Sequence, residues 1–281
     1  AAPVEVGEVM VGGTVSRVVT SDVKGFAPGD WVMNYGGWQD YSVSDGAGVT
    51  NLGPDPAHPS WALGILGMPG FTAWAGLTQI GQPKPGETIV VAAATGPVGA
   101  TVGQIGKILG CRVVGIAGGP EKCAYAVETL GFDACIDHKR DDLAQALAEA
   151  TPDGIDVYFE NVGGRVFDAV MPRLNTFARI PVCGLIAQYN ATELPPGPDR
   201  LSLLMGTILT RQMTVRGFIV FDTFAPLYPE FAKQMTQWIA EGRIHYREEI
   251  IDGLVNAPKA FIGLLRGDNF GKRVIRLGQP S

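Results

Sequence analysis

The stretch Glu87–Gly99, ETIVVAAATGPVG, decides the fold of this chain. A continuous apolar run leads directly into a glycine turn, and residues at helical spacing follow as far as Leu109. Such runs are typical of strands buried on both faces of a parallel sheet. The turn, Ala94–Gly99, has the form AxGxxG, a variant of the dinucleotide-binding fingerprint. We therefore expect a strand, a phosphate-binding turn and a helix in direct succession.

The residues of this turn have separate expected roles. Gly96 lets the backbone approach a pyrophosphate, and Gly99 lets the helix pack closely on the strand. The helix that begins at Pro97 and Val98 offers free N–H groups and the positive end of its dipole to phosphates. A turn that serves only the fold is the alternative. The next strand closes a βαβ unit of about 30 residues at Ala117, which favours a nucleotide site.

The end of that second strand indicates which nucleotide binds. An NAD enzyme needs an Asp or Glu there to hold the ribose 2′-hydroxyl. This chain has GIAGG at 115–119, with Gly118 at the critical place and no carboxylate. Lys122 then supplies a charge for a 2′-phosphate, although an ordinary solvated lysine is the alternative, and Glu121 lies beyond the strand end. The pattern favours NADPH over NADH.

Strands and helices alternate through the centre of the chain. Further strands are expected at 111–117, 133–137, 154–160, 176–184 and 213–221, with helices at 120–131 and 141–151. This alternation is typical of an α/β fold with a doubly wound parallel sheet. The residues up to Asn51 read as β structure, and strand-like sequence returns between His245 and Leu277. The Pro-rich stretch Glu193–Arg200 is expected to be a loop.

Composition and charge restrict the class of protein. The net charge is −6, and the pI is near 5.1, which argues against nucleic acid or an anionic membrane as the main partner. The N-terminus has no basic segment followed by an apolar one, so no secretory signal is expected. The uncharged stretch Pro56–Pro83 is interrupted by Pro69 and several glycines, which predicts buried helices rather than a membrane span.

No metal site is expected from the cysteines and histidines. The four cysteines form no CxxC pair and have no histidine at ligand spacing, so free buried thiols in a cytoplasmic protein are predicted. The cysteines are Cys111, Cys123, Cys135 and Cys183, and the histidines are His58, His138 and His245.

Several motifs, in order along nearly the whole chain, resemble one family. They are LGMPGFTAW (66–74), the glycine turn, ENVGG (160–164), ARIPVCG (178–184), YNATELPPGP (189–198), GFIVF (217–221) and GDNFGKRVI (267–275). The chain resembles the zinc-independent medium-chain reductases that include prostaglandin, 2-alkenal and curcumin reductases. The resemblance implies a Rossmann domain at 65–245 and a GroES-like substrate domain at 1–64 plus 246–281, usually in a homodimer. Family members begin well upstream, so the substrate domain is expected to be incomplete here.

The resemblance also implies site residues. The motif positions that would line the cofactor are Asn161, Cys183, Tyr189, Phe218 and Asn269, with Met68 and Thr72 near the nicotinamide. His138 stands where some relatives carry a tyrosine beside the adenosine. Each position has a structural alternative: the thiol as a small core residue, the phenylalanine as sheet packing, and the asparagines as residues of glycine turns.

The expected reaction follows from the absence of a metal pair. Zinc-bearing relatives have a His-Glu pair where this chain has Gly7 and Glu8. Hydride addition to an enone spreads charge onto an enolate oxygen, which hydrogen bonds from Tyr189, a ribose hydroxyl or water could hold, whereas an alkoxide needs stronger stabilisation. Thr210 occupies the position of a tyrosine proposed as proton donor in relatives. Quinone reduction and a non-catalytic NADPH-binding protein are the alternatives.

Overall fold

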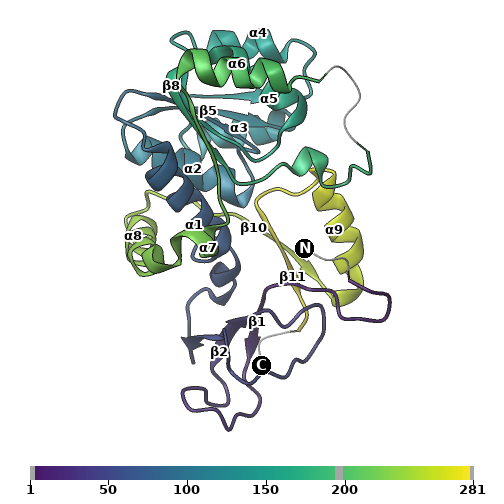
Figure 1. The fold of residues 1–281 in the computed structure, drawn as a ribbon. Helices are drawn as coiled ribbons and strands as arrows, with labels where there is room; N and C mark the ends of the chain where they lie inside the picture. The colour runs from purple at the N-terminus through teal and green to yellow at the C-terminus, as the bar shows by residue number, and fades with distance from the viewer. Residues whose placement is uncertain (1–3, 194–198, 279–281) are drawn as a thin grey trace.

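A six-stranded, fully parallel sheet forms the centre of the molecule (Figure 1). The structure, a computed structural model, describes residues 4–193 and 199–278. The strand order is β6-β5-β4-β7-β8-β9, which is the doubly wound order. The chain first adds β5 and β6 on one side of β4, and then adds β7, β8 and β9 on the other side of β4. The strands are β4 (Thr88–Ala92), β5 (Arg112–Ala117), β6 (Ala134–Asp137), β7 (Ile155–Phe159), β8 (Leu174–Val182) and β9 (Thr214–Gly217).

Helices cover both faces of this sheet. One face packs against α1 (Met68–Ala75), α2 (Pro97–Ile108), α3 (Pro120–Glu128), α7 (Val220–Phe224) and α8 (Tyr228–Ala240). The other face packs against α4 (Leu143–Ala150), α5 (Gly164–Val170) and α6 (Leu201–Arg211), the group at the top of Figure 1. Short helical turns join these elements at Pro59–Leu63 (η1), Gly76–Gly81 (η2), Met171–Arg173 (η3), Ile186–Gln188 (η4), Ala225–Leu227 (η5) and Leu254–Asn256 (η6).

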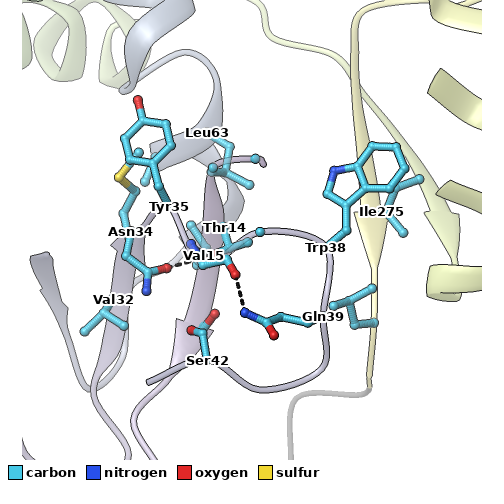
Figure 2. Close-up of a pocket in the computed structure, with 18 of the residues that line it drawn as sticks. Thr14, Val15, Val32, Asn34, Tyr35, Trp38, Gln39, Ser42, Leu63 and Ile275 are labelled. Carbon is cyan, nitrogen blue, oxygen red and sulfur yellow. Dashed lines mark hydrogen bonds between the residues drawn. The ribbon is translucent and has the colours of Figure 1, made fainter. Parts of the chain in front are cut away.

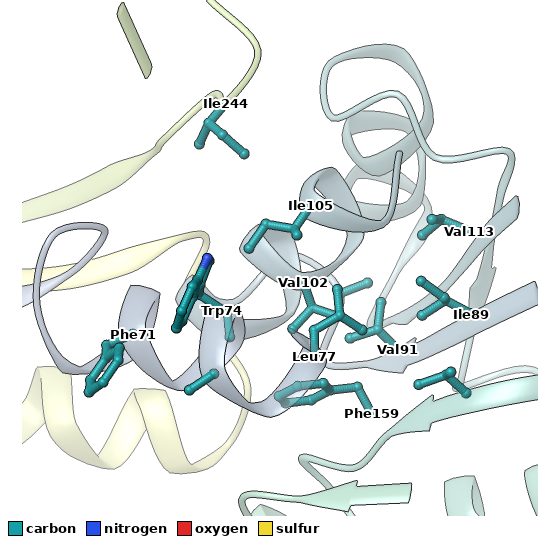
Figure 3. Packing of buried hydrophobic residues seen from close by; sticks show 14 of the residues in the cluster. Phe71, Trp74, Leu77, Ile89, Val91, Val102, Ile105, Val113, Phe159 and Ile244 are labelled. Carbon is teal, nitrogen blue, oxygen red and sulfur yellow. The ribbon is translucent and has the colours of Figure 1, made fainter. Parts of the chain in front are cut away.

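The alternation of side chains along β4 explains why its sequence is apolar throughout. Ile89 and Val91 belong to the core on the α1–α2 side, whereas Val90 and Ala92 belong to the core on the α4–α5 side. All four side chains are fully buried. Figure 3 shows the first of these cores, in which Leu77 and Val102 lie beside Val91 of β4, while Phe71 lies on the side away from the strands. Two-sided burial is therefore the reason for the run IVVA in the deciding stretch.

A smaller β-rich part lies below the central sheet in Figure 1. Its antiparallel sheet contains β1 (Thr14–Arg17), β2 (Trp31–Asn34) and β3 (Thr50–Gly53). A parallel pair, β10 (Glu248–Asp252) and β11 (Lys272–Arg276), is connected through α9 (Ala257–Leu265). The first and last segments of the chain thus lie in one region (Figure 1).

The uncharged stretch Pro56–Pro83 forms buried helical structure, as predicted. It contains η1, α1 and η2, and every residue of α1 after Met68 is buried. In the described part of the chain, no helix combines the length and the apolar character needed to cross a bilayer.

Three sequence predictions need correction. The strand predicted at 213–221 ends at Gly217, and α7 begins at Val220, because Phe218 and Val220 turn into the core beside α1. The β structure expected up to Asn51 is confined to short strands. Only Cys111 is fully buried, and the other three thiols are partly exposed. Most of the Pro-rich stretch Glu193–Arg200 lies outside the described residues.

Candidate cofactor and active site

The turn between β4 and α2 has the geometry expected of a phosphate site. Gly96 is the N-cap of α2 in an extended conformation, Pro97 occupies the first helical turn, and no side chain caps the helix. The N–H groups of Val98 and Gly99 therefore point outward without a capping partner. Ala93 has a φ of 53°, a left-handed conformation that is unusual for a residue with a Cβ. Such backbone strain is characteristic of functional turns.

Gly99 is required by the close approach of α2 to the strand that precedes it. A Cβ placed on Gly99 would lie 2.3 Å from the carbonyl oxygen of Ala93. That contact is with backbone and cannot be relieved by a side-chain rotation. The packing role predicted for Gly99 is confirmed.

Two lysines, Lys122 and Lys139, and His138 lie near the end of β5. A Cβ on Gly118 would lie 3.0 Å from His138 Nε2 and 3.7 Å from Lys139 Cε. Lys122 donates from Nζ to the carbonyl of Gly267 at 2.7 Å. Burial lowers the pKa of the Lys122 ammonium, and repulsion from Lys139 lowers it further. The structure therefore brings together Gly118, Lys122 and His138, and it adds Lys139, which the sequence reasoning missed although it adjoins His138.

The segment Gly267–Gly271 lies against the phosphate turn. Gly271 N–H donates to the Thr95 carbonyl at 3.2 Å, and Asn269 Nδ2 donates to the Gly271 carbonyl at 3.0 Å. Phe270 meets Tyr125 of α3 edge to face, with ring centroids 5.0 Å apart. Asn269 is thereby placed beside the turn, in the region where the family motif implies it.

Arg247 is a second residue that the sequence reasoning missed. Its guanidinium lies 3.8 Å from the centre of the Phe270 ring and 5.6 Å from that of Tyr125. These cation–π contacts brace the segment that touches the phosphate turn. Arg247 immediately precedes β10, and no sequence motif indicated that it would lie here.

Asn161 and Cys183 meet at the carboxyl ends of β7 and β8. Asn161 Nδ2 donates to the Ala92 carbonyl at 2.8 Å, and the Cys183 thiol donates to Asn161 Oδ1 at 2.8 Å. Burial, helped by the nearby Glu160, raises the pKa of the Cys183 thiol to about 12. The thiol is therefore a protonated hydrogen-bond donor at neutral pH, and it holds the asparagine rather than acting as a nucleophile.

Tyr189 lies near the same place. A Cβ on Gly184 would lie 3.1 Å from the Tyr189 hydroxyl and 3.5 Å from the Asn161 carbonyl. The Tyr189 side chain is 61% exposed, so its hydroxyl is accessible from solvent. The structure brings Tyr189, Asn161 and Cys183 to one edge of the sheet.

Glu160 organises the loop that carries Asn161. Its Oε1 accepts hydrogen bonds from the backbone N–H of Val162 at 2.7 Å and of Gly163 at 2.9 Å, and from the Tyr158 hydroxyl at 3.0 Å. Its Oε2 is buried and, among the described residues, has no partner. Burial raises the pKa of this carboxyl, although these three donors oppose the rise. Only the motif ENVGG could have pointed to this residue.

Met68 and Thr72 lie on the first turns of α1. Thr72 is buried and its hydroxyl donates to Met68 Sδ at 3.5 Å, whereas Met68 is 46% exposed. Phe218 has its side chain in the core, where it packs against Phe224 with ring centroids 5.9 Å apart. The Phe218 side chain thus packs in the core, and the role of this residue at the cofactor stays a prediction.

A cavity of about 1380 Å³ extends through the β-rich part as far as Met68. Figure 2 shows its walls, with Asn34 and Tyr35 on β2 and its continuation, and Trp38 near Ile275 of β11. Most of its lining side chains are apolar, with hydroxyl and amide groups interspersed. The cavity places an apolar space next to the exposed start of α1.

Thr210, which stands at the position of a family tyrosine, lies on α6. Its hydroxyl donates to the Gly206 carbonyl of its own helix at 2.8 Å. Glu8 is exposed near the N-terminus. In the ranges 4–193 and 199–278, no three His, Cys, Asp or Glu residues are arranged to hold a metal ion.

The sheet order, the uncapped turn and the β-rich second part together define a dinucleotide-binding medium-chain fold. Residues 97–241 match the family described as zinc-binding dehydrogenase, and residues 1–52 match the N-terminal domain of oxidoreductase. The chain belongs to the medium-chain dehydrogenase/reductase family, in its zinc-independent group.

Three relatives illustrate the similarity. The NADPH-dependent curcumin reductase of Escherichia coli is 65% identical over 98% of this chain and 80% of its own length. The NADP(+)-dependent 2-alkenal reductase of Nicotiana tabacum is 41% identical over 97% of this chain and 78% of its length. The crystal structure of CurA in complex with NADPH from Vibrio vulnificus superposes with a TM-score of 0.97, at 62% identity, over 100% of this chain and 83% of that one.

Proposed function

We propose that this protein is an NADPH-dependent reductase of the C=C bond of α,β-unsaturated aldehydes and ketones. The similarity to a curcumin reductase and a 2-alkenal reductase supports the reaction. The observation that carries the cofactor is an uncapped α2 N-terminus together with a β5 end whose own residues include no carboxylate and near which Lys122 and Lys139 lie.

The residues present fit a bound NADPH. The phosphate turn offers the backbone N–H groups of Val98 and Gly99, and Gly118 has no side chain at the end of β5. The proposed cofactor-binding residues are Met68, Thr72, Gly96, Pro97, Val98, Gly99, Gly118, Lys122, His138, Asn161, Cys183, Tyr189, Phe218 and Asn269.

Bound NADPH supplies the hydride. The largely apolar cavity that reaches Met68 would hold the enone. Attack at the β-carbon moves charge to the carbonyl oxygen of the substrate, and Tyr189, proposed as the catalytic residue, would donate a hydrogen bond to that oxygen. The α-carbon then takes a proton from solvent or from a side chain. An enolate needs only this modest stabilisation.

The position of a transferred label tests the reaction. With deuterium at the transferring position of NADPH and a simple enone, we expect a saturated ketone labelled at the β-carbon and a solvent-derived proton at the α-carbon. An allylic alcohol labelled at the carbonyl carbon would show ketone reduction instead. Turnover of quinones but of no enone would favour the quinone alternative.

We further propose a homodimer in the cytoplasm, with a substrate domain at 1–64 plus 246–281 and a cofactor domain at 65–245. Support for the dimer comes from β9, an edge strand whose four residues are all exposed. Val215, Ile219 and Leu209 expose apolar surface on and beside this edge, which two copies could cover by pairing about a two-fold axis. The four free thiols support a reducing compartment.

A further inference from the structure

The end of β5 carries more positive charge than Lys122 alone provides. β6 pairs with β5 so that Ala117 lies opposite Asp137, and the residues after Asp137 therefore lie beside Gly118. His138 N–H donates to the Ala117 carbonyl at 2.9 Å, which continues this pairing by one residue. Lys139 is thereby placed next to the end of β5 by the sheet itself.

Asp137 holds the backbone of Lys139 in place. Its Oδ1 accepts the N–H of Gly119 at 2.9 Å and the N–H of Lys139 at 3.0 Å. The carboxylate is therefore engaged by both strand ends, and these hydrogen bonds lower its pKa although burial opposes them. One carboxylate therefore links the backbone after β5 to the backbone after β6.

Lys122 is already engaged, whereas the Lys139 ammonium is not. Lys122 Nζ donates to the Gly267 carbonyl, and Asp268 and Glu249 lie close enough to favour its charge. Lys139 is exposed, and in the described part of the chain its ammonium has no hydrogen bond or ion pair. Its Cε would nonetheless lie 3.7 Å from a Cβ on Gly118. A second ammonium close to Lys122, without a partner of its own among the described residues, indicates a place for an anion.

We propose that Lys139 is a specificity-determining residue that contacts the 2′-phosphate of NADPH, together with Lys122 and His138. This inference rests on the proposed function, because it requires a nucleotide with its adenosine ribose at the end of β5. Lys139 would select NADPH over NADH by its charge, while Gly118 presents no carboxylate that would repel the phosphate.

Binding of 2′,5′-ADP and 5′-AMP to the whole chain, measured by calorimetry without turnover, tests the proposal. The variant Lys139→Gln should bind 2′,5′-ADP about 5-fold more weakly, as expected for an exposed charge pair, and bind 5′-AMP as the wild type does. Lys139→Arg should restore the affinity to within about twofold because it keeps the charge. Lys233→Gln, which removes the same charge from the exposed face of α8, is the matched control and should change neither affinity.

The outcomes separate this inference from the proposed function. Equal affinity of Lys139→Gln and the wild type for 2′,5′-ADP overturns the role of Lys139 and leaves the cofactor assignment standing. Equal weakening of both nucleotides also overturns it, because the effect is then not on the 2′-phosphate. A wild type that binds neither nucleotide rejects both proposals. The difference in affinity for 2′,5′-ADP between Lys139→Gln and the wild type should also become smaller at high salt, since exposed charges are screened.

Discussion

Glu160 is only 2% exposed, and one of its oxygens bears the hydrogen bonds that shape the loop before α5. Burial raises the pKa of this carboxyl because it disfavours the charged form, whereas the two N–H groups need only an acceptor oxygen. At the scale of a single residue, the acceptor atom matters more than the charge.

Replacement of Glu160 separates these two properties. Glu160→Ala leaves the N–H groups of Val162 and Gly163 without acceptors, and we expect it to lower the free energy of unfolding by about 3–5 kcal/mol. Glu160→Gln keeps an oxygen at Oε1 but buries an amide without a partner, so a loss of about 1–2 kcal/mol is expected. Urea unfolding measures both. Equal losses would show that the acceptor does not stabilise the loop.

His138 makes stability depend on pH. Burial lowers the pKa of its imidazole below 6.5, nearby Asp137 opposes this, and the cations Lys139, Arg165 and Lys122 reinforce it. As pH falls through 6.5, the unfolded chain takes up a proton that the folded chain does not, so the folded state loses stability until the folded pKa is passed.

The variant His138→Gln should therefore lose less stability than the wild type between pH 7.5 and pH 5.5. Urea unfolding at the two pH values, without nucleotide, measures the difference. Parallel pH dependence in both proteins would contradict the assignment, because the carboxyl groups common to both would then account for all of it.

At the scale of elements, the contact between α2 and the turn after β4 positions the phosphate site. Gly99 permits this contact because any Cβ there would strike the backbone of Ala93. The first turn of α2 is therefore held against the end of the strand, with its N–H groups directed outward.

Gly99→Ala should be destabilising even though alanine favours helices. Alanine would gain roughly 1 kcal/mol of helix propensity, but opening the backbone contact costs about 2–3 kcal/mol, so a net loss of about 1–2 kcal/mol is expected. Gly206→Ala on α6 is the matched control, because a Cβ there would meet nothing within 4 Å, and it should be neutral or stabilising. Thermal or urea unfolding decides between the two. A stabilised Gly99→Ala protein would contradict the close packing.

At the scale of the whole molecule, β9 is an exposed edge strand whose outer backbone groups are available to pair with another strand. The opposite edge of the sheet, β6, is partly buried, whereas all four residues of β9 are exposed. Pairing of two β9 edges would continue the six-stranded sheet across a dimer.

Val215→Lys places a charge at the centre of that proposed interface and should shift the protein from dimer to monomer in sedimentation equilibrium. Val255→Lys is the matched control, since Val255 is 86% exposed in η6, away from β9, and should leave the assembly unchanged. A monomeric wild type, or a dimer that survives Val215→Lys unchanged, would contradict this arrangement.

The amino-acid sequence by itself determined the doubly wound sheet, its phosphate turn and the family of the chain. These follow from local patterns: a buried parallel strand must be apolar on both faces, and a helix that starts at a phosphate needs glycines at set places. The roles of Gly96 and Gly99 therefore follow from their spacing along the chain, and so does the absence of a carboxylate at the end of β5.

Only the tertiary structure decided which distant residues meet. Lys139 lies beside Gly118 because β6 pairs with β5, and Arg247 reaches Phe270 because the last strands fold back to the phosphate turn. The prediction of a strand through Phe218 was wrong for the same reason. Burial of that side chain in the core beside α1 stabilises a turn there more than the local β propensity stabilises a strand. Contacts between residues far apart in sequence leave no periodic signal along the chain, so packing alone sets them.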